Sequence, residues 1–432
     1  MTQAAQDGET RSAVHSTFSA LFVPIAPILL VVTAHATARH LRSIRPYGVA
    51  LIVLLLTSAS GFCQQLFDPD PYDYPLWNLL NRPIMGPERG KFEVNYVYWY
   101  LQKLRVPPLV TTGPEGSDAV LGEPGTVVLR GGNRLKSRHG RFIGFRNTAE
   151  YWLTDRVGLD ATVFILERDS SNLTYRHHQY TPLARPYVDA ATGENRSEVI
   201  AGFVPGLGNL AGSINVYSRV EVFGQDANIL YRWRTGENYH WNAIVGARFL
   251  QMRERLDITA TSFVQPAETT VYGQADHFQT FMKFFGAQTG FTGEIRRGDW
   301  FIAAKGALAL GADVQIVRAK GDRVIHPPEG RETRPYGLYV LPSNTGHFER
   351  TVLDFVTEWQ INIGYMLAPR LRARIGYSLL TWNNPVRPGD QIEPLDLSQL
   401  NPEAPPGQSP AMKFRSDFFW AQGLNFGVEA RW

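Results

Sequence analysis

Apolar and polar residues alternate along this chain with a period of two, over stretches longer than an ordinary strand. In residues 353–365 every second position is uncharged and mostly apolar, and the positions between them include Asp354 and Glu358. After a short turn, residues 371–379 repeat the pattern with Arg372 and Arg374 on the charged face. Period-two alternation is typical of a strand with one apolar and one polar face. The pattern therefore predicts a hairpin that separates an apolar medium from a polar interior.

The same alternation recurs to the C-terminus and predicts an all-β fold, a single transmembrane antiparallel β-barrel of about ten strands, from roughly eight to twelve. Short turns and long loops alternate between the strands, and an even number places both ends on the periplasmic side. The loop 103–139 contains VVLR at 127–130, which could form a further strand. The predicted strands are 91–102, 140–153, 158–168, 213–233, 240–257, 277–295, 299–317, 348–365, 370–382 and 416–432.

One predicted strand contains a change of parity. The apolar residues of segment 214–222 have even numbers, whereas those of 227–231 have odd numbers. We expect a β-bulge at Gly224–Gln225, because one extra residue would keep both sets on a single outer face. On this interpretation Arg219 and Glu221 face the barrel interior.

A membrane barrel explains the strand lengths better than a soluble sandwich, whose strands typically have about five or six residues. The final strand, 416–432, alternates to a terminal aromatic residue. Its residues Phe426, Val428 and Trp432 resemble the signal by which bacterial barrels are recognised by the barrel assembly machinery. Aromatic residues near the ends of the predicted strands would form an interfacial girdle: Tyr151, Trp152, Trp233, Trp241, Trp300, Tyr365 and Trp382.

The amino-acid composition argues against several other classes of protein. The 432 residues include 43 Lys+Arg and 40 Asp+Glu, a formal net charge of +3, so no clustered basic surface for nucleic acid is indicated. A single cysteine excludes a disulfide scaffold. A polytopic helical protein is excluded because it needs repeated apolar stretches of about 20 residues.

The N-terminal region carries the pattern of a secretory signal peptide. Residues 47–63 contain a short apolar run, with Arg39, Arg42 and Arg45 before it and small residues after it. We expect residues 1–63 to be an extension and a cleaved signal with its apolar core at 47–57, followed by a periplasmic lead-in at 64–90 and the barrel at 91–432. The 46 residues ahead of the signal are either an anchoring helix or the result of a start codon placed too early, and we expect the second.

Eight segments together resemble one bacterial family of outer-membrane β-barrel porins, the planctomycete-type group seven. The resemblance covers about residues 90–432, and its last two segments are the most specific. It implies an outer-membrane barrel acting as a porin; terminal Trp432 departs from the family, which more often ends in Phe. The segments are PPLVTTGPEG (107–116), VLGEPGTVVLRGG (120–132), GRFIGFRNTAEYWL (140–153), PLARPYVDAATGE (182–194), GARFLQMRERLDI (246–258), LPSNTGHFER (341–350), YSLLTWNNPVRPGDQI (377–392) and SDFFWAQGLNFGVEARW (416–432).

Charged residues on the predicted interior faces are candidate lumen-lining groups. They could form an ion-selecting constriction, or a salt-bridged network that fills a narrow barrel, since barrels near eight strands are filled and open channels have about 16. The candidates are Arg219, Glu221, Lys305, Asp313, Asp354, Glu358, Arg372, Arg374 and Glu429.

From these observations we expect passive diffusion of ions or small solutes through the lumen, in a protein whose partners are outer-membrane lipid and the assembly machinery. The alternative is a closed barrel with functional loops, which an inward fold of loops 383–413 or 318–347 would favour. A third possibility, an outer-membrane hydrolase, needs clustered Asp and His at the rim. Asp276 and His277 point to opposite faces of a strand, and His177–His178, near Asp169 in sequence, lack placed partners. We therefore expect no enzyme activity, cofactor or metal, and the oligomeric state stays open.

Overall fold

Ten antiparallel strands close a barrel in the computed structural model, which describes residues 88–432 except 133–140, 266–270, 328–329 and 402–407. The predicted signal peptide and most of the lead-in lie outside these residues. Each of the ten strands pairs with two neighbours, and the pairing of β9 with β10 closes the ring. The strands are β1 (Gly90–Leu101), β4 (Phe142–Trp152), β5 (Val157–Leu166), β9 (Gly208–Thr235), β10 (Tyr239–Val264), β11 (Val271–Arg297), β12 (Trp300–His326), β14 (Gly346–Ala368), β15 (Leu371–Trp382) and β16 (Phe419–Arg431). These are the ten strands that the alternation predicts.

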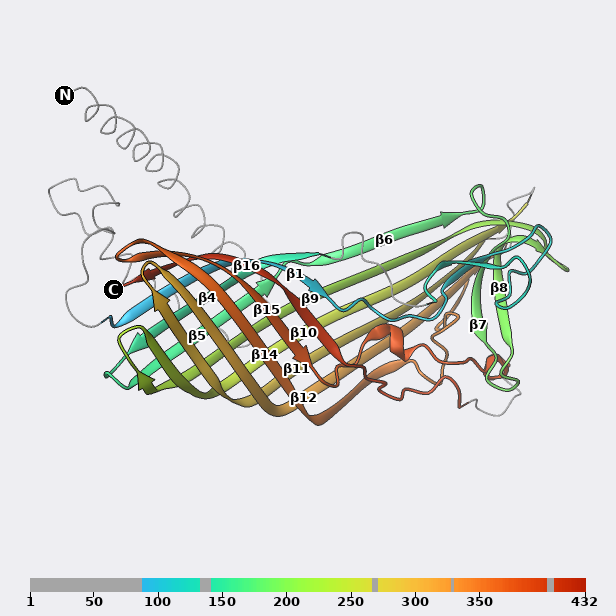
Figure 1. Cartoon of the computed structure of the whole chain (residues 1–432). Coiled ribbons are helices and arrows are strands. Elements are labelled where there is room, and N and C mark those ends of the chain that lie inside the picture. The colour runs from blue at the N-terminus through green and yellow to red at the C-terminus, as the bar shows by residue number, and fades with distance from the viewer. Residues whose placement is uncertain (1–87, 133–140, 266–270, 328–329, 402–407) are drawn as a thin grey trace, which may run out of the picture.

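The two ends of the barrel sequence meet at one end of the molecule (Figure 1). Strand β1 pairs with β16, and the backbone N–H groups of Arg89 and Gly90 donate to the carbonyl oxygen of Trp432 at 2.9 and 3.0 Å. The Trp432 ring lies against Gly90, where an added Cβ would be 2.4 Å from it. Short turns join the strands at this end, as predicted for the periplasmic side.

A band of exposed apolar side chains surrounds the barrel. On β11 the outward residues Phe285, Phe291 and Ile295 are exposed and span eleven residues, which matches the roughly 9–11 residues of a tilted transmembrane strand. Neighbouring strands continue the band with Ile302, Leu310, Leu353, Trp359, Ile361, Ile363 and Ile375. Among the residues described, no helix is long and apolar enough to cross a membrane.

Four of the strands, β9 to β12, run far beyond the barrel and form an extracellular extension (Figure 1). Strands β9 to β12 have 26–28 residues each, whereas β1, β5 and β15 have 10–12. Six further strands bring the described sheet to sixteen: β2 (Val110–Thr112), β3 (Val127–Arg130), β6 (Asp169–Arg176), β7 (Leu183–Val188), β8 (Asn195–Val204) and β13 (Glu332–Arg334). The expected strand at 127–130 is therefore present.

The apolar face of the long strands changes sides where they leave the barrel. On β10 the apolar Val245 points outward from the barrel, but in the extension Leu256 and Ile258 are buried inside while Thr259 and Thr261 point out. Odd-numbered residues of β10 point outward in both the barrel and the extension, but the medium around the strand changes from lipid to water. Outward positions therefore become polar in the extension.

This change of medium corrects the expected bulge at Gly224–Gln225. The register of β9 is continuous there with both β5 and β10, and the shift lies instead between Trp241 and Asn242 of β10. No extra residue is needed at 224–225, because the even-numbered valines of 214–222 belong to the inward face of the extension.

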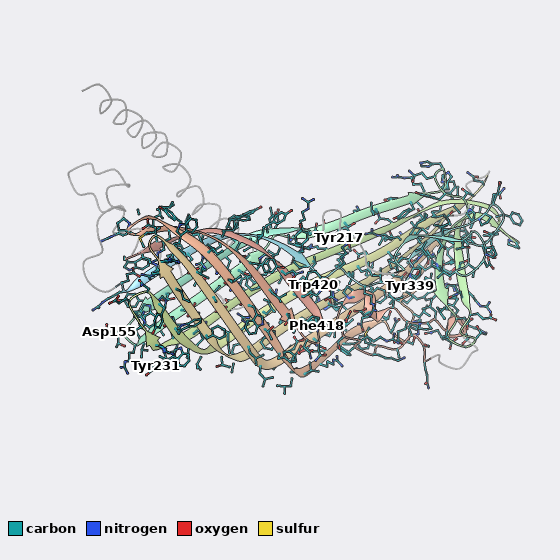
Figure 2. The ribbon with its side chains drawn as sticks, viewed as in Figure 1. Asp155, Tyr217, Tyr231, Tyr339, Phe418 and Trp420 are labelled. Carbon is teal, nitrogen blue, oxygen red and sulfur yellow. The ribbon has the colours of Figure 1, made fainter. Side chains whose placement is uncertain are left out.

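The extension encloses its own apolar core, to which the chain segments 104–110, 336–341 and 383–400 contribute. The described residues of segment 383–415 include two 3-10 helices, η2 (Pro388–Gln391) and η3 (Leu397–Leu400). Figure 2 places Tyr339 in the extension and Asp155 and Tyr231 at the opposite, short-turn end. Of the two loops whose inward fold would favour a closed barrel, segment 336–341 of loop 318–347 and segment 383–400 of loop 383–413 do fold inward, whereas residues 318–326 continue β12. Buried members of this core include Leu109, Ile214, Leu256, Phe278, Tyr339 and Leu395.

Candidate functional site

A cluster of ion pairs fills the short-turn end of the barrel interior. The Nη1 atom of Arg372 lies 2.9 Å from Glu294 and 3.6 Å from Glu429. Arg374, the next inward residue on β15, pairs with Glu93 and lies 3.4 Å from Glu429. These five side chains come from β1, β11, β15 and β16 and are almost fully buried. Arg431 of β16 also pairs with Glu294 and Glu429 and supplies a third positive charge for the three carboxylates.

A second charged cluster surrounds Glu358 of β14, which is completely buried. Its carboxylate pairs with Arg146 of β4 and Arg248 of β10. Arg248 also lies 3.2 Å from Asp226, and Lys305 is 3.4 Å from the same carboxylate. A cavity of about 60 Å³ between the two clusters has room for only a few water molecules.

An apolar layer crosses the barrel above the charged clusters. It contains the fully buried aromatic residues Trp99 (β1), Phe284 (β11), Trp382 (β15) and Phe419 (β16). All ten barrel strands contribute at least one side chain, and Val386 from segment 383–415 packs into it. The layer consists of Val97, Trp99, Leu101, Phe142, Phe164, Leu166, Val222, Leu250, Met252, Met282, Phe284, Ala309, Val317, Val356, Leu380, Trp382, Val386, Phe419 and Ala421.

The barrel mouth is tied to segment 383–415 by buried polar contacts. Arg387 donates to Glu254 of β10 at 2.9 and 2.6 Å. The backbone N–H of Asn384 donates to Asp354 at 3.1 Å, and its carbonyl accepts from Gln315 at 2.7 Å. Burial raises the pKa of Asp390 in η2 to about 6, although the neighbouring Arg387 opposes the shift.

A further buried carboxylate holds the far end of the extension together. Asp276 of β11 accepts the backbone N–H groups of Leu338, Tyr339 and Val340 at 3.2, 2.9 and 2.8 Å. It also pairs with the fully buried Arg185 of β7. Asp276 therefore fixes the inward fold of segment 336–341.

The structure places seven of the nine candidate residues on the inward face and two on the outward face. Lys305, Glu358, Arg372, Arg374 and Glu429 lie in the two charged clusters. The two remaining inward candidates, Asp313 and Asp354, are buried near the barrel mouth, where Gln315 and Asn384 contact them.

The interior assignment of Arg219 and Glu221 is wrong. Both have the parity of the exposed Ile229 and Tyr231 on β9, so they point outward. There Arg219 pairs with Glu221, which also lies 2.6 Å from Arg168. The error follows from the switch of apolar face, because the valines that oppose them are buried inside the extension rather than exposed to lipid.

Four interior groups were not predicted from the alternation: Glu93, Arg146, Asp226 and Arg248. On β1 the inward face that carries Glu93 also carries Val97 and Trp99, and the outward face carries tyrosines. Such a strand shows no polar alternation, so only its pairing register with β16 could have identified the inward face.

The residues of the expected assembly signal lie on or beside β16. Phe426 is exposed on the outer face opposite Tyr96 and Ile375, and Val428 lies opposite Val94. Trp432 follows the strand. Their recognition by an assembly machinery stays a prediction.

The histidine candidates do not converge on one rim site. His277 faces outward, with Nδ1 2.8 Å from Asp257, while Asp276 is buried on the inward face, as expected. Asp169 begins β6 and His177 follows its other end. Within the described part of the chain, no group of three or more His, Cys, Asp or Glu side chains could hold a metal ion.

The chain is weakly similar to several solved structures. The outer membrane protease OmpT from Escherichia coli is 11% identical, with coverage of 82% of this chain and 100% of that chain and a TM-score of 0.31. A Pseudomonas aeruginosa FadL homologue is 8% identical, with 80% and 90% coverage and a TM-score of 0.23. The Pseudomonas putida toluene transporter TodX is 10% identical, with 80% and 90% coverage and a TM-score of 0.17. At these TM-scores the likeness carries no functional argument.

Family membership comes from the sequence itself. No curated protein matches the chain significantly. The sequence model of the family described as "Putative beta barrel porin-7" matches residues 92–432, which is all of the closed barrel and its extension except the first two residues of β1. The chain therefore belongs to this family and is a β-barrel of the bacterial outer membrane.

Proposed function

We propose that this protein is a closed outer-membrane barrel whose function lies in its extracellular extension. The observation that carries the proposal is the apolar layer to which all ten barrel strands contribute. A diffusion channel for ions or polar solutes needs a continuous wetted path, and a packed layer of aromatic and aliphatic side chains excludes water. Ten strands also lie nearer the side-chain-filled barrels than the open 16-stranded channels.

The length of the strands supports a role for the extension. A membrane crossing requires about 9–11 residues per strand, so more than half of each of β9, β10, β11 and β12 lies outside it. The extension has its own core and its own buried ion pair between Arg185 and Asp276. It is built as a folded domain, and we propose that it presents a binding surface outside the cell.

Passive diffusion of ions or small solutes is the second candidate function. The family description includes the word porin, and the two charged clusters border a polar cavity. Conduction would require movement of segment 383–415 together with opening of the apolar layer, because Val386 belongs to that layer.

Planar-bilayer conductance of the purified, folded protein distinguishes the two functions. We expect no discrete steps from the wild type under conditions in which an open 16-stranded porin conducts. Discrete steps whose cation/anion preference changes in Arg372→Gln and Arg374→Gln would contradict the closed barrel. Liposome swelling in small sugars provides a second measurement, and we expect none.

We further propose that the chain has no hydrolytic activity. The carboxylate of Asp276 already accepts three backbone N–H groups and pairs with Arg185. The carboxylate of Asp257, which contacts His277 on the outer face, has Arg255 at 2.6 Å as its other partner, and no second acid–histidine pair contacts it among the described residues. Incubation of the folded protein with a peptide library tests this proposal, and cleavage that depends on His277 would contradict it.

A further inference from the structure

Two guanidinium groups on the outer face of the extension lie against one aromatic ring, and a lysine occupies the next outward position of the same strand. Arg253 of β10 lies directly opposite Phe281 of β11, and its guanidinium carbon is 4.6 Å from the centre of that ring. The guanidinium of Arg318 on β12 is 5.2 Å from the same ring. Lys283 is the next outward residue after Phe281 on β11. We call Arg253, Lys283 and Arg318 the Phe281 cation cluster.

None of these three cations forms an ion pair with the described residues. Glu221 of β9 lies directly opposite Arg253, but its carboxylate pairs with Arg219 and Arg168 instead. Other cations nearby are neutralised: Arg255 lies 2.6 Å from Asp257, and Lys320 lies 3.1 Å from Asp322. Arg318 instead donates to the Nδ1 atom of His347 at 3.0 Å, and the carboxylate of Glu349 lies 3.7 Å from that imidazole rather than at a guanidinium. The Phe281 cation cluster therefore carries an excess of positive charge.

The cluster lies at the border of the apolar band. Along the outward positions of β11, Lys283 lies between Phe281 and the strongly exposed Phe285. The outward apolar residues from Phe285 to Ile295 already span one membrane crossing. The cations therefore lie at the height of the extracellular headgroups, where long basic side chains extend from an apolar surface toward polar groups.

We propose that the Phe281 cation cluster binds the phosphate groups of a phosphorylated lipid in the outer leaflet of the outer membrane. Guanidinium groups bind phosphate oxygens through two parallel hydrogen bonds, and Lys283 adds a point charge. Contact with Phe281 orients both guanidinium groups without neutralising them. The acyl chains of the same lipid would lie against Phe285 and its apolar neighbours, an interaction that a free phosphate ion lacks. This inference does not depend on whether the barrel conducts.

Native mass spectrometry of the full folded protein tests the proposal with three probes: bisphosphorylated lipid A, the same lipid without phosphates, and inorganic phosphate. The test variant is Arg253→Gln/Lys283→Gln/Arg318→Gln. Its matched control, Arg176→Gln/Arg255→Gln/Lys320→Gln, removes three other surface cations from the extension and changes the net charge equally. Phe281→Leu keeps the three cations and removes only the ring.

We expect the bisphosphorylated lipid to bind the wild type and the control within about twofold of each other, and the test variant at least about tenfold more weakly. Phe281→Leu should fall between them. Equal binding to the test and control variants would overturn the proposal, as would equal binding of the dephosphorylated lipid. Binding of inorganic phosphate alone that displaces the lipid would indicate a free-anion site and overturn the lipid assignment. If the triple variant fails to insert, Phe281→Leu and Arg318→Gln provide the same comparison.

Discussion

Glu254 and Arg387 form a two-pronged ion pair inside the mouth of the barrel, with nitrogen–oxygen distances of 2.9 and 2.6 Å. The same guanidinium donates through Nη1 to the carbonyl oxygens of Gln102 and Lys103 at 3.1 and 3.0 Å. One side chain of segment 383–415 therefore connects β10 with the chain that leaves β1. This contact holds the segment against the apolar layer.

Replacing Arg387 with methionine should release segment 383–415. The substitution leaves Glu254 buried without its partner, which costs about 3–5 kcal/mol. Hydrogen exchange of residues 383–400 in the folded protein measures the release, and we expect loss of protection there with the barrel strands still protected. The control Arg105→Met removes a largely exposed cation 3.8 Å from Asp417 and should cost at most about 1 kcal/mol.

The double variant Glu254→Met/Arg387→Met distinguishes loss of the ion pair from the cost of leaving Glu254 buried without a partner. Because no buried charge is left unpaired, most of the lost stability should return. Unchanged protection in Arg387→Met alone would show that the pair does not hold the segment.

The position of the lipid-facing band leads to a prediction at Ile363. This residue is exposed on β14 and lies opposite Ile302 and Ile375, which also face outward. Ile363→Arg should destabilise the barrel by about 2–4 kcal/mol near the bilayer midplane. Unfolding in lipid vesicles by denaturant measures the cost. Leu173→Arg on β6, exposed outside the band, is the matched control and should be nearly neutral; an equal cost at both positions would mean that the band is misplaced.

The buried ion pairs predict a stability cost at Arg374. Arg374→Ala leaves the buried carboxylates of Glu93 and Glu429 without one of their cations, and we expect a loss of about 3–5 kcal/mol. A wetted pore would tolerate the change, because water would solvate the freed carboxylates. The control Arg334→Ala breaks an exposed pair with Glu332 and should cost at most about 1 kcal/mol. Denaturant unfolding gives the free energy of unfolding of both variants relative to the wild type. A large loss in Arg374→Ala alone indicates a packed interior, and a small loss in both indicates a wetted one.

The sequence predicts the barrel well because the lipid-facing alternation is local. Residues 353–365 and 371–379 show both faces of a hairpin without reference to any other strand, and all ten predicted strands are present. The same rule fails at Arg219 and Glu221. Alternation identifies an apolar and a polar face but does not say which of the two points outward, because that depends on whether lipid or water surrounds the strand.

The closed interior depends on contacts that are distant in sequence. Glu254 and Arg387 are 133 residues apart, and Trp99 donates to Asn425 across 326 residues. The sequence around each of these residues contains no pattern that indicates its distant partner. Their meeting follows from the register of the closed barrel and the inward fold of segment 383–415, which no local pattern specifies.

Titration of Asp390 should make the attachment of segment 383–415 dependent on pH. Burial raises the pKa of this carboxyl to about 6 in the folded protein, above the value of about 3.9 expected in an unfolded chain. The folded state therefore holds its proton more tightly than the released segment does. Stability is complete below about pH 4 and decreases as the pH rises toward 6.

The charged groups that interact with Asp390 are Arg387, which favours its ionised form, and Asp417 and Glu254, which oppose it. Asp390→Asn removes the titration but keeps the shape of the side chain. We expect hydrogen exchange of residues 383–400 to be faster at pH 7.5 than at pH 4.5 in the wild type, after correction for intrinsic exchange rates. The difference between wild type and variant is the relevant quantity, because other carboxyls titrate in both proteins. If the variant retains the full dependence between pH 4 and 6, then Asp390 is not its source, and the segment is held by contacts that do not titrate in this range.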